Sequence, residues 1–274
     1  IITQQIVPIY LHGIIKKKYL IKKKITKVIG FLMLRYKNRI VFTGGSGRFA
    51  KIFKSKERQT KFTFFFPKKK ELNILNGNSI LKYLKNKKPK YLVHLAGLSR
   101  PMSIHDKDIV QSIDKNIVGT ANIVKICSKL NIKLVYISTC YVYPGLKGNY
   151  SEESALKPIN SYAWSKLGGE CAVMLYKNSL ILRTSVTEKP FVHKGAFSDF
   201  KTNFIFHEDL VLKILKIINQ KGIINIGGKT QSVYNFVKRY NKTIKKFSAK
   251  KILGKKAPLN PSMNIDKFRK LIND

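Results

Sequence analysis

The chain has 274 residues, of which 44% are hydrophobic and 25% charged, as expected for a globular protein with a buried core. No uninterrupted apolar run reaches the roughly 18–20 residues that span a bilayer. The lysines at 16–18 and the lack of a small-residue cleavage site after an apolar stretch argue against a secretory signal. These features predict a cytoplasmic protein without membrane insertion.

The net charge of +40 would suit a polyanionic partner such as nucleic acid. However, the lysines are spread along the whole chain, and no basic module interleaved with aromatic residues is present. Lysine, isoleucine and asparagine are abundant throughout, as an AT-rich genome would produce. Compositional drift is therefore the favoured explanation, and no nucleic-acid partner is predicted.

Neither the cysteines nor the acidic residues predict a metal site. Cys127, Cys140 and Cys171 are too few and too scattered for a disulfide framework or a paired-cysteine site, and are expected to be reduced core thiols. The run His207-Glu208-Asp209 places its side chains on different faces of a helix, so they do not converge on one ion. Acidic residues favour the first turn of a helix, and a helix start is predicted there.

Residues 1–37 do not look like the first element of a domain, because lysine triplets interrupt their apolar segments. We expect them to form a basic extension outside the fold. From residue 38 onward, short β-branched runs alternate with helical patterns, which indicates an α/β fold with a parallel sheet covered on both faces. Strands are predicted at 40–42, 62–66, 91–95, 134–137, 179–182 and 223–226, and helices from about 49 and 79 and over 108–130, 161–176, 208–219 and 231–240.

The segment TGGSGRFA, residues 43–50, follows the first predicted strand and precedes a helix, where a dinucleotide-binding loop belongs. Glycines there permit unusual backbone angles and leave room for a pyrophosphate, and the helix N-terminus offers free N–H groups to the phosphates. The segment predicts a Rossmann-type doubly wound sheet, with a core at 38–184 and a small substrate-binding lobe at 185–274 that is interleaved with the last core elements. The predicted cofactor-binding residues of the loop are Gly44, Gly45, Gly47, Arg48, Phe49 and Ala50.

The residues after the second predicted strand favour NADP over NAD. An acidic residue there would bind the ribose hydroxyls of NAD, whereas cations suit the 2′-phosphate of NADP. Here Pro67 leads into three lysines at 68–70, and Arg48 could add to them.

Three residues predict proton-transfer chemistry beside this loop. Tyr162 and Lys166 are four residues apart on one helix face, where an ammonium can favour the phenolate. Thr139 ends the fourth predicted strand, at the sheet edge where such folds form active sites, and Ser138 is the adjacent alternative. We predict Thr139, Tyr162 and Lys166 as the catalytic set, with Tyr162 and Lys166 also contacting the cofactor.

Together the strings TGGSGRFA, VHLAG, ISTCYVYPG, YAWSKLGGE and ILRTS resemble the extended short-chain dehydrogenase/reductases, above all the dTDP-4-dehydrorhamnose reductase and sugar-nucleotide-binding group. The resemblance runs from about residue 38 to the end. It implies hydride transfer between a nicotinamide and a 4-keto sugar carbon, with Tyr162 supplying the proton. It also implies that Asn73 and Ile74 lie near the adenine, although the family usually has Asp at position 73, and that Ala96 and Gly97 flank the cofactor.

One departure from the family pattern affects the substrate. The reductases usually carry Asp where this chain has Cys140, which weakens the substrate assignment and argues against a 4,6-dehydratase, since that reaction needs an acidic pair. The residues predicted to contact the sugar or its phosphates are Arg100, Tyr143, Arg183, Thr184 and His193.

The resemblance leaves three hypotheses open. The first is an NADP-dependent reductase of a nucleotide-linked 4-keto-deoxysugar that serves polysaccharide synthesis. The second is a nucleotide-sugar 4-epimerase with tightly bound NAD. The third is a catalytically silent NADP-binding regulatory subunit, and against it stands the intact set of three catalytic residues. A homodimer is a further expectation from the family.

Overall fold

A computed structural model describes residues 19–26, 28–30, 38–254 and 257–272. Within these residues the central sheet has six parallel strands in the order β10-β5-β4-β3-β1-β2. Its strands are β1 (Arg39–Thr43), β2 (Thr63–Phe65), β3 (Tyr91–His94), β4 (Lys133–Thr139), β5 (Ser179–Thr184) and β10 (Gly222–Ile226). The Rossmann-type prediction and all six predicted strands are confirmed.

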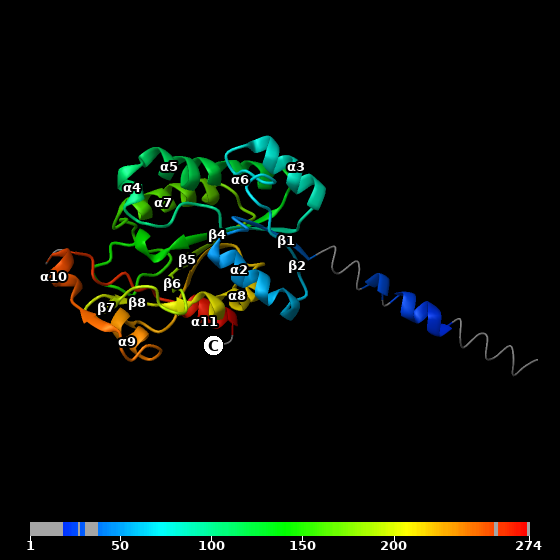
Figure 1. Ribbon diagram of the computed structural model, residues 1–274. Helices are drawn as coiled ribbons and strands as arrows, with labels where there is room; N and C mark the ends of the chain where they lie inside the picture. The colour runs from blue at the N-terminus through cyan, green and yellow to red at the C-terminus, as the bar shows by residue number, and fades with distance from the viewer. Residues whose placement is uncertain (1–18, 27, 31–37, 255–256, 273–274) are drawn as a thin grey trace, which may run out of the picture.

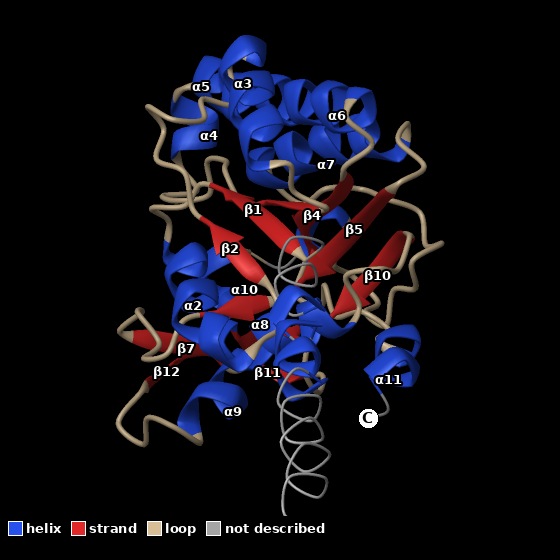
Figure 2. Cartoon of the chain, turned by 90° about the vertical axis from the view of Figure 1, so that its right-hand side faces the viewer, coloured by secondary structure: helices blue, strands red, loops and turns tan. Residues whose placement is uncertain are grey.

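The central strands are buried along their whole length, because helices cover both faces of the sheet (Figures 1 and 2). One face carries α3 (Gly77–Lys87), α4 (Ile104–Lys107), α5 (Ile109–Ile113), α6 (Gly119–Lys129) and α7 (Ser161–Met174). The opposite face carries α2 (Arg48–Lys56), α8 (His207–Lys216) and α11 (Asp266–Ile272). Each face has its own apolar cluster, with Phe42, Phe53 and Ile214 on the α2 side and Ile80, Ile123 and Tyr136 on the α6 side.

The helix predicted over 108–130 is not regular throughout. A π-helical turn, Asp114–Val118, joins α5 to α6. Such a turn adds a residue to the helix and shifts which side chains face the sheet, and it is often found at functional sites. As a result, the buried Asn116 points into the molecule, toward the loop that follows β3.

A smaller lobe lies beyond the carboxyl end of β5 and carries the shorter pairs of strands (Figure 1). Its elements are β6 (Val186–Thr187), β7 (Gly195–Phe197), β8 (Lys201–Thr202), β9 (Ile205–Phe206), β11 (Gln231–Ser232), α9 (Val233–Lys238), β12 (Lys245–Phe247) and α10 (Ala249–Leu253). The chain leaves this lobe to add α8 and β10 to the core, so the two parts are interleaved.

Most of the N-terminal extension, residues 1–18, 27 and 31–37, lies outside the described residues. Residues 19–26 and 28–30 are helical, and nearly all of them are exposed. No helix in the described parts of the chain is long and apolar enough to cross a membrane. The prediction of three core thiols is wrong for Cys171, which is exposed, whereas Cys127 and Cys140 are buried.

Candidate active site

A cavity of about 1660 Å³ opens at the carboxyl ends of the central strands, between the core and the small lobe. This is the edge at which open α/β sheets bind their ligands. Its walls are formed by the loop after β1, the loop after β3, the end of β4, one side of α7 and the segment after β5. The predicted residues that line it are Gly44, Gly47, Arg48, Phe49, Ala50, Ala96, Gly97, Arg100, Thr139, Tyr162, Lys166, Thr184 and His193.

The glycine loop is held close to neighbouring backbone. Gly44 has φ of +68°, and a Cβ there would lie 2.9 Å from the backbone of Ala96. Gly45 sits against the end of β2, since a Cβ there would lie 2.6 Å from the backbone of Phe66. The loop closes with a hydrogen bond from the Gly47 N–H to the Gly44 carbonyl at 2.8 Å.

The loop leads directly into the N-terminus of α2. Gly47 caps this helix without a side-chain hydrogen bond, and the first turn contains no acidic residue. The first amides of α2 and its partial positive charge are therefore available to an anion in the cavity, such as a pyrophosphate.

A buried chain of hydrogen bonds fixes the residue before the glycine loop to the neighbouring strand and helix. Thr43 Oγ1 accepts the N–H groups of Leu95 and Ala96, both at 3.1 Å, so its proton is directed to His94 Nδ1 at 2.7 Å. His94 Nε2 then donates to Thr120 Oγ1 at 3.1 Å. Burial lowers the pKa of His94 to about 3, so the ring is neutral at pH 7 and acts as a rigid link between β1, β3 and α6.

The structure brings the three predicted catalytic side chains to one wall of the cavity. Thr139 ends β4, and its hydroxyl accepts the Tyr141 N–H at 3.3 Å. Tyr162 and Lys166 lie on α7, whose N-terminus is capped by Asn160 through the Ala163 N–H. Ser138, the alternative to Thr139, is buried with no hydrogen-bond partner for its hydroxyl among the described residues.

Burial shifts the pKa of both α7 side chains. It raises the pKa of Tyr162 to about 12, and the nearby Cys140 adds to this rise while Arg100 opposes it. Burial lowers the pKa of Lys166 to about 7, and Glu170 opposes this change. Tyr162 is thus a protonated phenol at neutral pH. The Lys166 ammonium forms no hydrogen bond or ion pair with a described residue; its Nζ lies 4.0 Å from the centre of the Tyr136 ring.

Asn116 is a positioning residue that sequence reasoning missed. Its Oδ1 accepts the Leu98 N–H at 2.7 Å, and its Nδ2 donates to the Leu98 carbonyl at 2.9 Å and to Ser165 Oγ at 2.8 Å. The amide thereby joins the loop after β3 to α7. Gly97 is required at this contact, because a Cβ there would lie 2.8 Å from Asn116 Oδ1.

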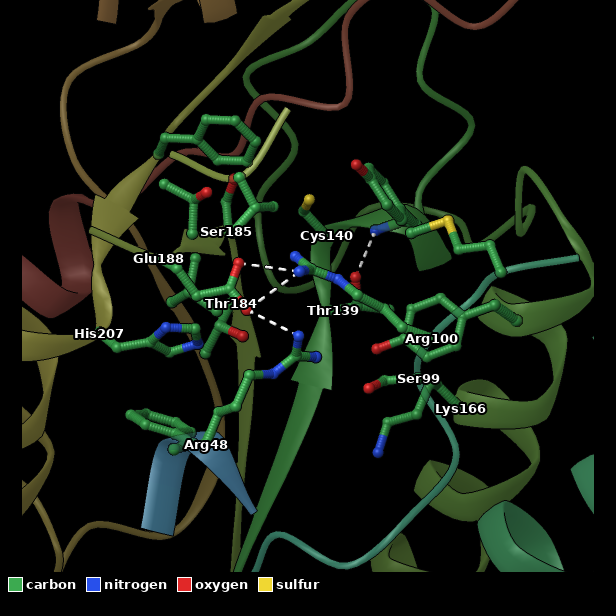
Figure 3. A pocket seen from close by; sticks show the side chains of 18 of the residues that line it. Arg48, Ser99, Arg100, Thr139, Cys140, Lys166, Thr184, Ser185, Glu188 and His207 are labelled. Carbon is green, nitrogen blue, oxygen red and sulfur yellow. Dashed lines mark hydrogen bonds and ion pairs between the residues drawn. The ribbon is translucent and has the colours of Figure 1, made fainter. Parts of the chain in front are cut away.

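Glu188, just after β6, was also missed. Its carboxylate lies between two arginines that come from different strand ends, as Figure 3 shows. Arg48 Nη1 is 3.0 Å from Glu188 Oε1, and Arg100 Nη1 is 2.9 Å and 2.8 Å from the two carboxylate oxygens. The arginines hold the pKa of Glu188 below its usual range against the opposing effect of burial. A sequence signal did exist, since Glu188 lies four residues beyond the end of β5, near the edge where such sheets bind their ligands.

Two predicted substrate residues have structural roles instead. Arg183 is buried inside the core, where it pairs with Glu170 at 2.8 Å and donates to Tyr143 Oη at 2.9 Å. Tyr143 is fully buried and donates to Asn225. Neither side chain lines the cavity, so the structure does not support their assignment as substrate contacts.

The remaining predicted residues lie outside the cavity wall. Asn73 and Ile74 belong to the loop between β2 and α3, where Asn73 Oδ1 accepts the Leu75 N–H at 3.1 Å and the Ile74 carbonyl accepts from Asn122 at 3.1 Å. Their proximity to an adenine stays a prediction. In the described residues no group of three or more His, Cys, Asp or Glu side chains could hold a metal ion.

The model of the RmlD substrate-binding domain family matches residues 38–196, more than half of the chain. Among curated proteins, dTDP-4-dehydrorhamnose reductase of Aggregatibacter actinomycetemcomitans is 26% identical over 202 residues, which are 71% of this chain and 63% of that protein. Methionine adenosyltransferase 2 subunit beta of Xenopus laevis is 31% identical over 103 residues, 38% of this chain and 30% of that protein. The chain thus spans less than two thirds of the length of these relatives.

Solved structures share the fold. A dTDP-4-dehydrorhamnose reductase from Bacillus anthracis in complex with NADP has a TM-score of 0.75 and 22% identity, covering 85% of this chain and 92% of that one. The enzyme WbmG of Bordetella bronchiseptica in complex with NAD has a TM-score of 0.66 and 18% identity, covering 86% and 87%. With its parallel sheet, glycine loop and edge cavity, this chain belongs to the RmlD substrate-binding domain family, within the extended short-chain dehydrogenase/reductases.

Proposed function

We propose that this chain is an NADP-dependent reductase of a nucleotide-linked 4-keto-deoxysugar. The observation that carries the proposal is the shared cavity, in which Thr139, Tyr162 and Lys166 face the same space as the glycine loop. The relatedness to dTDP-4-dehydrorhamnose reductases supports the substrate class.

The residues present fit a nicotinamide dinucleotide. The uncapped N-terminus of α2 offers amides for the pyrophosphate, and Gly44 and Gly47 keep side chains out of its path. Lys166 has donors free for the ribose hydroxyls. The exposed lysines at 68–70 follow β2, whose end packs on Gly45, and this supports the preference for NADP.

A nicotinamide cofactor held by the glycine loop would supply a hydride for the keto carbon of the sugar. The chain's own residues manage the oxygen: Thr139 and Tyr162 donate hydrogen bonds to it, and the Tyr162 phenol gives up its proton as the alkoxide forms. The raised pKa of Tyr162 keeps that proton in place until the oxygen becomes basic. The phenolate then recovers a proton from solvent.

The proposal is tested with Tyr162→Phe and wild-type protein, given NADPH and a dTDP-linked 4-keto-6-deoxysugar. We expect NADPH consumption by the variant to fall by about 100-fold or more, with NADPH affinity changed by less than about threefold. Turnover that survives the substitution would contradict the role of Tyr162.

One observation favours the regulatory hypothesis as a second candidate. Several curated relatives are named as a β subunit of methionine adenosyltransferase 2 rather than as reductases. Under this hypothesis the chain binds the dinucleotide, but neither wild type nor Tyr162→Phe reduces a nucleotide-linked keto sugar. The epimerase hypothesis predicts instead that NAD stays bound through purification.

The partner predictions remain open to experiment. Ile109 and Val110 on α5 are exposed apolar side chains, and such residues would suit a contact in the predicted homodimer. Sedimentation analysis at several protein concentrations tests this prediction.

The prediction of no nucleic-acid partner is tested by measuring binding of the protein to duplex DNA and RNA. Binding that disappears at moderate salt would support the prediction.

A further inference from the structure

We propose that Glu188 is an internal stand-in for the diphosphate of a nucleotide ligand, which takes over Arg48 and Arg100 when it binds. The proposal deepens the proposed function, because it assigns the ligand-binding role of three residues in the same cavity. It concerns binding alone, so it can hold or fail independently of reductase activity.

Basic side chains outnumber acidic ones in the cavity. Among the described residues that line it, Arg48, Arg100, Lys166 and Lys194 carry cationic groups, and Glu188 carries the one carboxylate. A cavity with this balance attracts anions. The carboxylate is placed where it contacts two of the four cations at once (Figure 3).

Both arginines lie in or next to loops at the cavity edge of the sheet. Arg48 is the first residue of α2, directly after the glycine loop, so its side chain starts beside the amides that suit a pyrophosphate. Arg100 follows β3 on the adjacent loop, and its charge acts on Tyr162. A diphosphate between the loop and Tyr162 would lie within the span of both guanidinium groups, which bind phosphate oxygens in pairs.

The ion pairs of Glu188 with the two arginines are weak enough for a diphosphate to replace the carboxylate. The Arg48 side chain is 57% exposed and that of Arg100 36%, while Glu188 is only 14% exposed. Water reaches both cations, and ion pairs of this kind contribute little to stability. The contrast is the pair of Arg183 with Glu170, whose side chains are 2% and 0% exposed and which is built into the core.

Glu188 therefore competes with the ligand for the arginines and holds them in place until the ligand arrives. Removing its charge while keeping its shape should strengthen binding of nucleoside diphosphates. It should also make Arg48 more important for binding, because Glu188 supplies the carboxylate that Arg48 pairs with among the described residues.

The experiment measures dissociation constants by calorimetry for wild type, Glu188→Gln, Arg48→Gln and the double variant. Two ligands, NADPH and dTDP, distinguish the cofactor diphosphate from the sugar-nucleotide diphosphate, and adenosine and thymidine serve as phosphate-free probes. Asp209→Asn is the matched control: Asp209 is an exposed acid in the first turn of α8, and the two arginines pair with Glu188 instead.

We expect Glu188→Gln to bind at least one of the two ligands about three- to tenfold more tightly, with the nucleosides unaffected. Arg48→Gln should cost more affinity in the Glu188→Gln background than in wild type, which gives a coupling that a general charge effect cannot produce. The ligand that responds identifies the diphosphate.

Unchanged or weaker binding by Glu188→Gln would overturn the proposal, as would equal tightening by Asp209→Asn or no binding of either ligand by any of these proteins. A chain that binds NADPH with the expected pattern but reduces no keto sugar would refute the proposed function while supporting this inference.

Discussion

Replacing Glu170 with glutamine should lower the free energy of unfolding by about 3–5 kcal/mol. Glu170 lies on α7 and accepts three hydrogen bonds from Arg183 on β5, at 3.3, 3.2 and 2.8 Å. Burial lowers the pKa of Arg183, but the hydrogen bonds and charge of Glu170 outweigh this effect and raise it. The variant keeps the size of the side chain and removes its charge, so a charged guanidinium remains in the core without its counter-ion.

The magnitude follows from the burial of the pair. The two side chains are 0% and 2% exposed, and breaking such a pair from one side costs far more than the pair itself contributes. For a chain of this size, that loss corresponds to a fall in Tm of roughly 6–20 °C. Tyr143 keeps its hydrogen bond to Arg183 in the variant, which favours the lower end of the range.

Urea unfolding followed by circular dichroism measures the change, with thermal melting as a second readout. The control is Asp266→Asn, since Asp266 forms an exposed pair with Arg269 at 3.7 Å, and we expect a change below about 1 kcal/mol. A Glu170→Gln variant as stable as this control would refute the role assigned to the buried pair.

Two further predictions concern Gly97 and His94, which line the cavity. Gly97→Ala should weaken NADPH binding and lower stability by about 1–3 kcal/mol, since its Cβ would lie 2.8 Å from Asn116 Oδ1; unchanged NADPH titrations and urea curves would contradict it. His94 should make stability fall as pH falls from about 6.5 toward about 3, because the unfolded chain binds a proton on this residue that the folded chain refuses. The stability difference between wild type and His94→Gln should shrink over that window by at most about 1.4 kcal/mol per pH unit, and parallel curves would argue against a neutral buried ring.

The fold could be predicted because its signals are local. Each central strand is a short apolar run, and the run at 40–42 ends in a glycine-rich turn that few other structures require. That Thr139, Tyr162 and Lys166 meet in one cavity could be predicted for the same reason: Tyr162 and Lys166 lie on one helix turn, and Thr139 ends a recognisable strand.

Side-chain partners could not be predicted, because they depend on contacts between distant segments. Nothing local distinguishes a ligand-binding arginine from Arg183, whose partner Glu170 lies on the helix packed beside its strand. The partners of Glu188 are 88 and 140 residues away along the chain. The π-helical turn that directs Asn116 inward has no clear sequence pattern, so a regular helix was the natural prediction.

Transfer of deuterium from NADPH to the sugar is the most direct test of the proposed reduction. Wild-type protein receives NADPH deuterated at the transferable position of the nicotinamide together with a dTDP-linked 4-keto-6-deoxysugar, and the sugar is analysed by mass spectrometry and NMR. We expect one deuterium on the former keto carbon with wild type, and at least about 100-fold less labelled sugar with Tyr162→Phe over the same time. A chain that binds NADPH tightly yet leaves every keto sugar offered to it unlabelled would contradict the proposed reductase function.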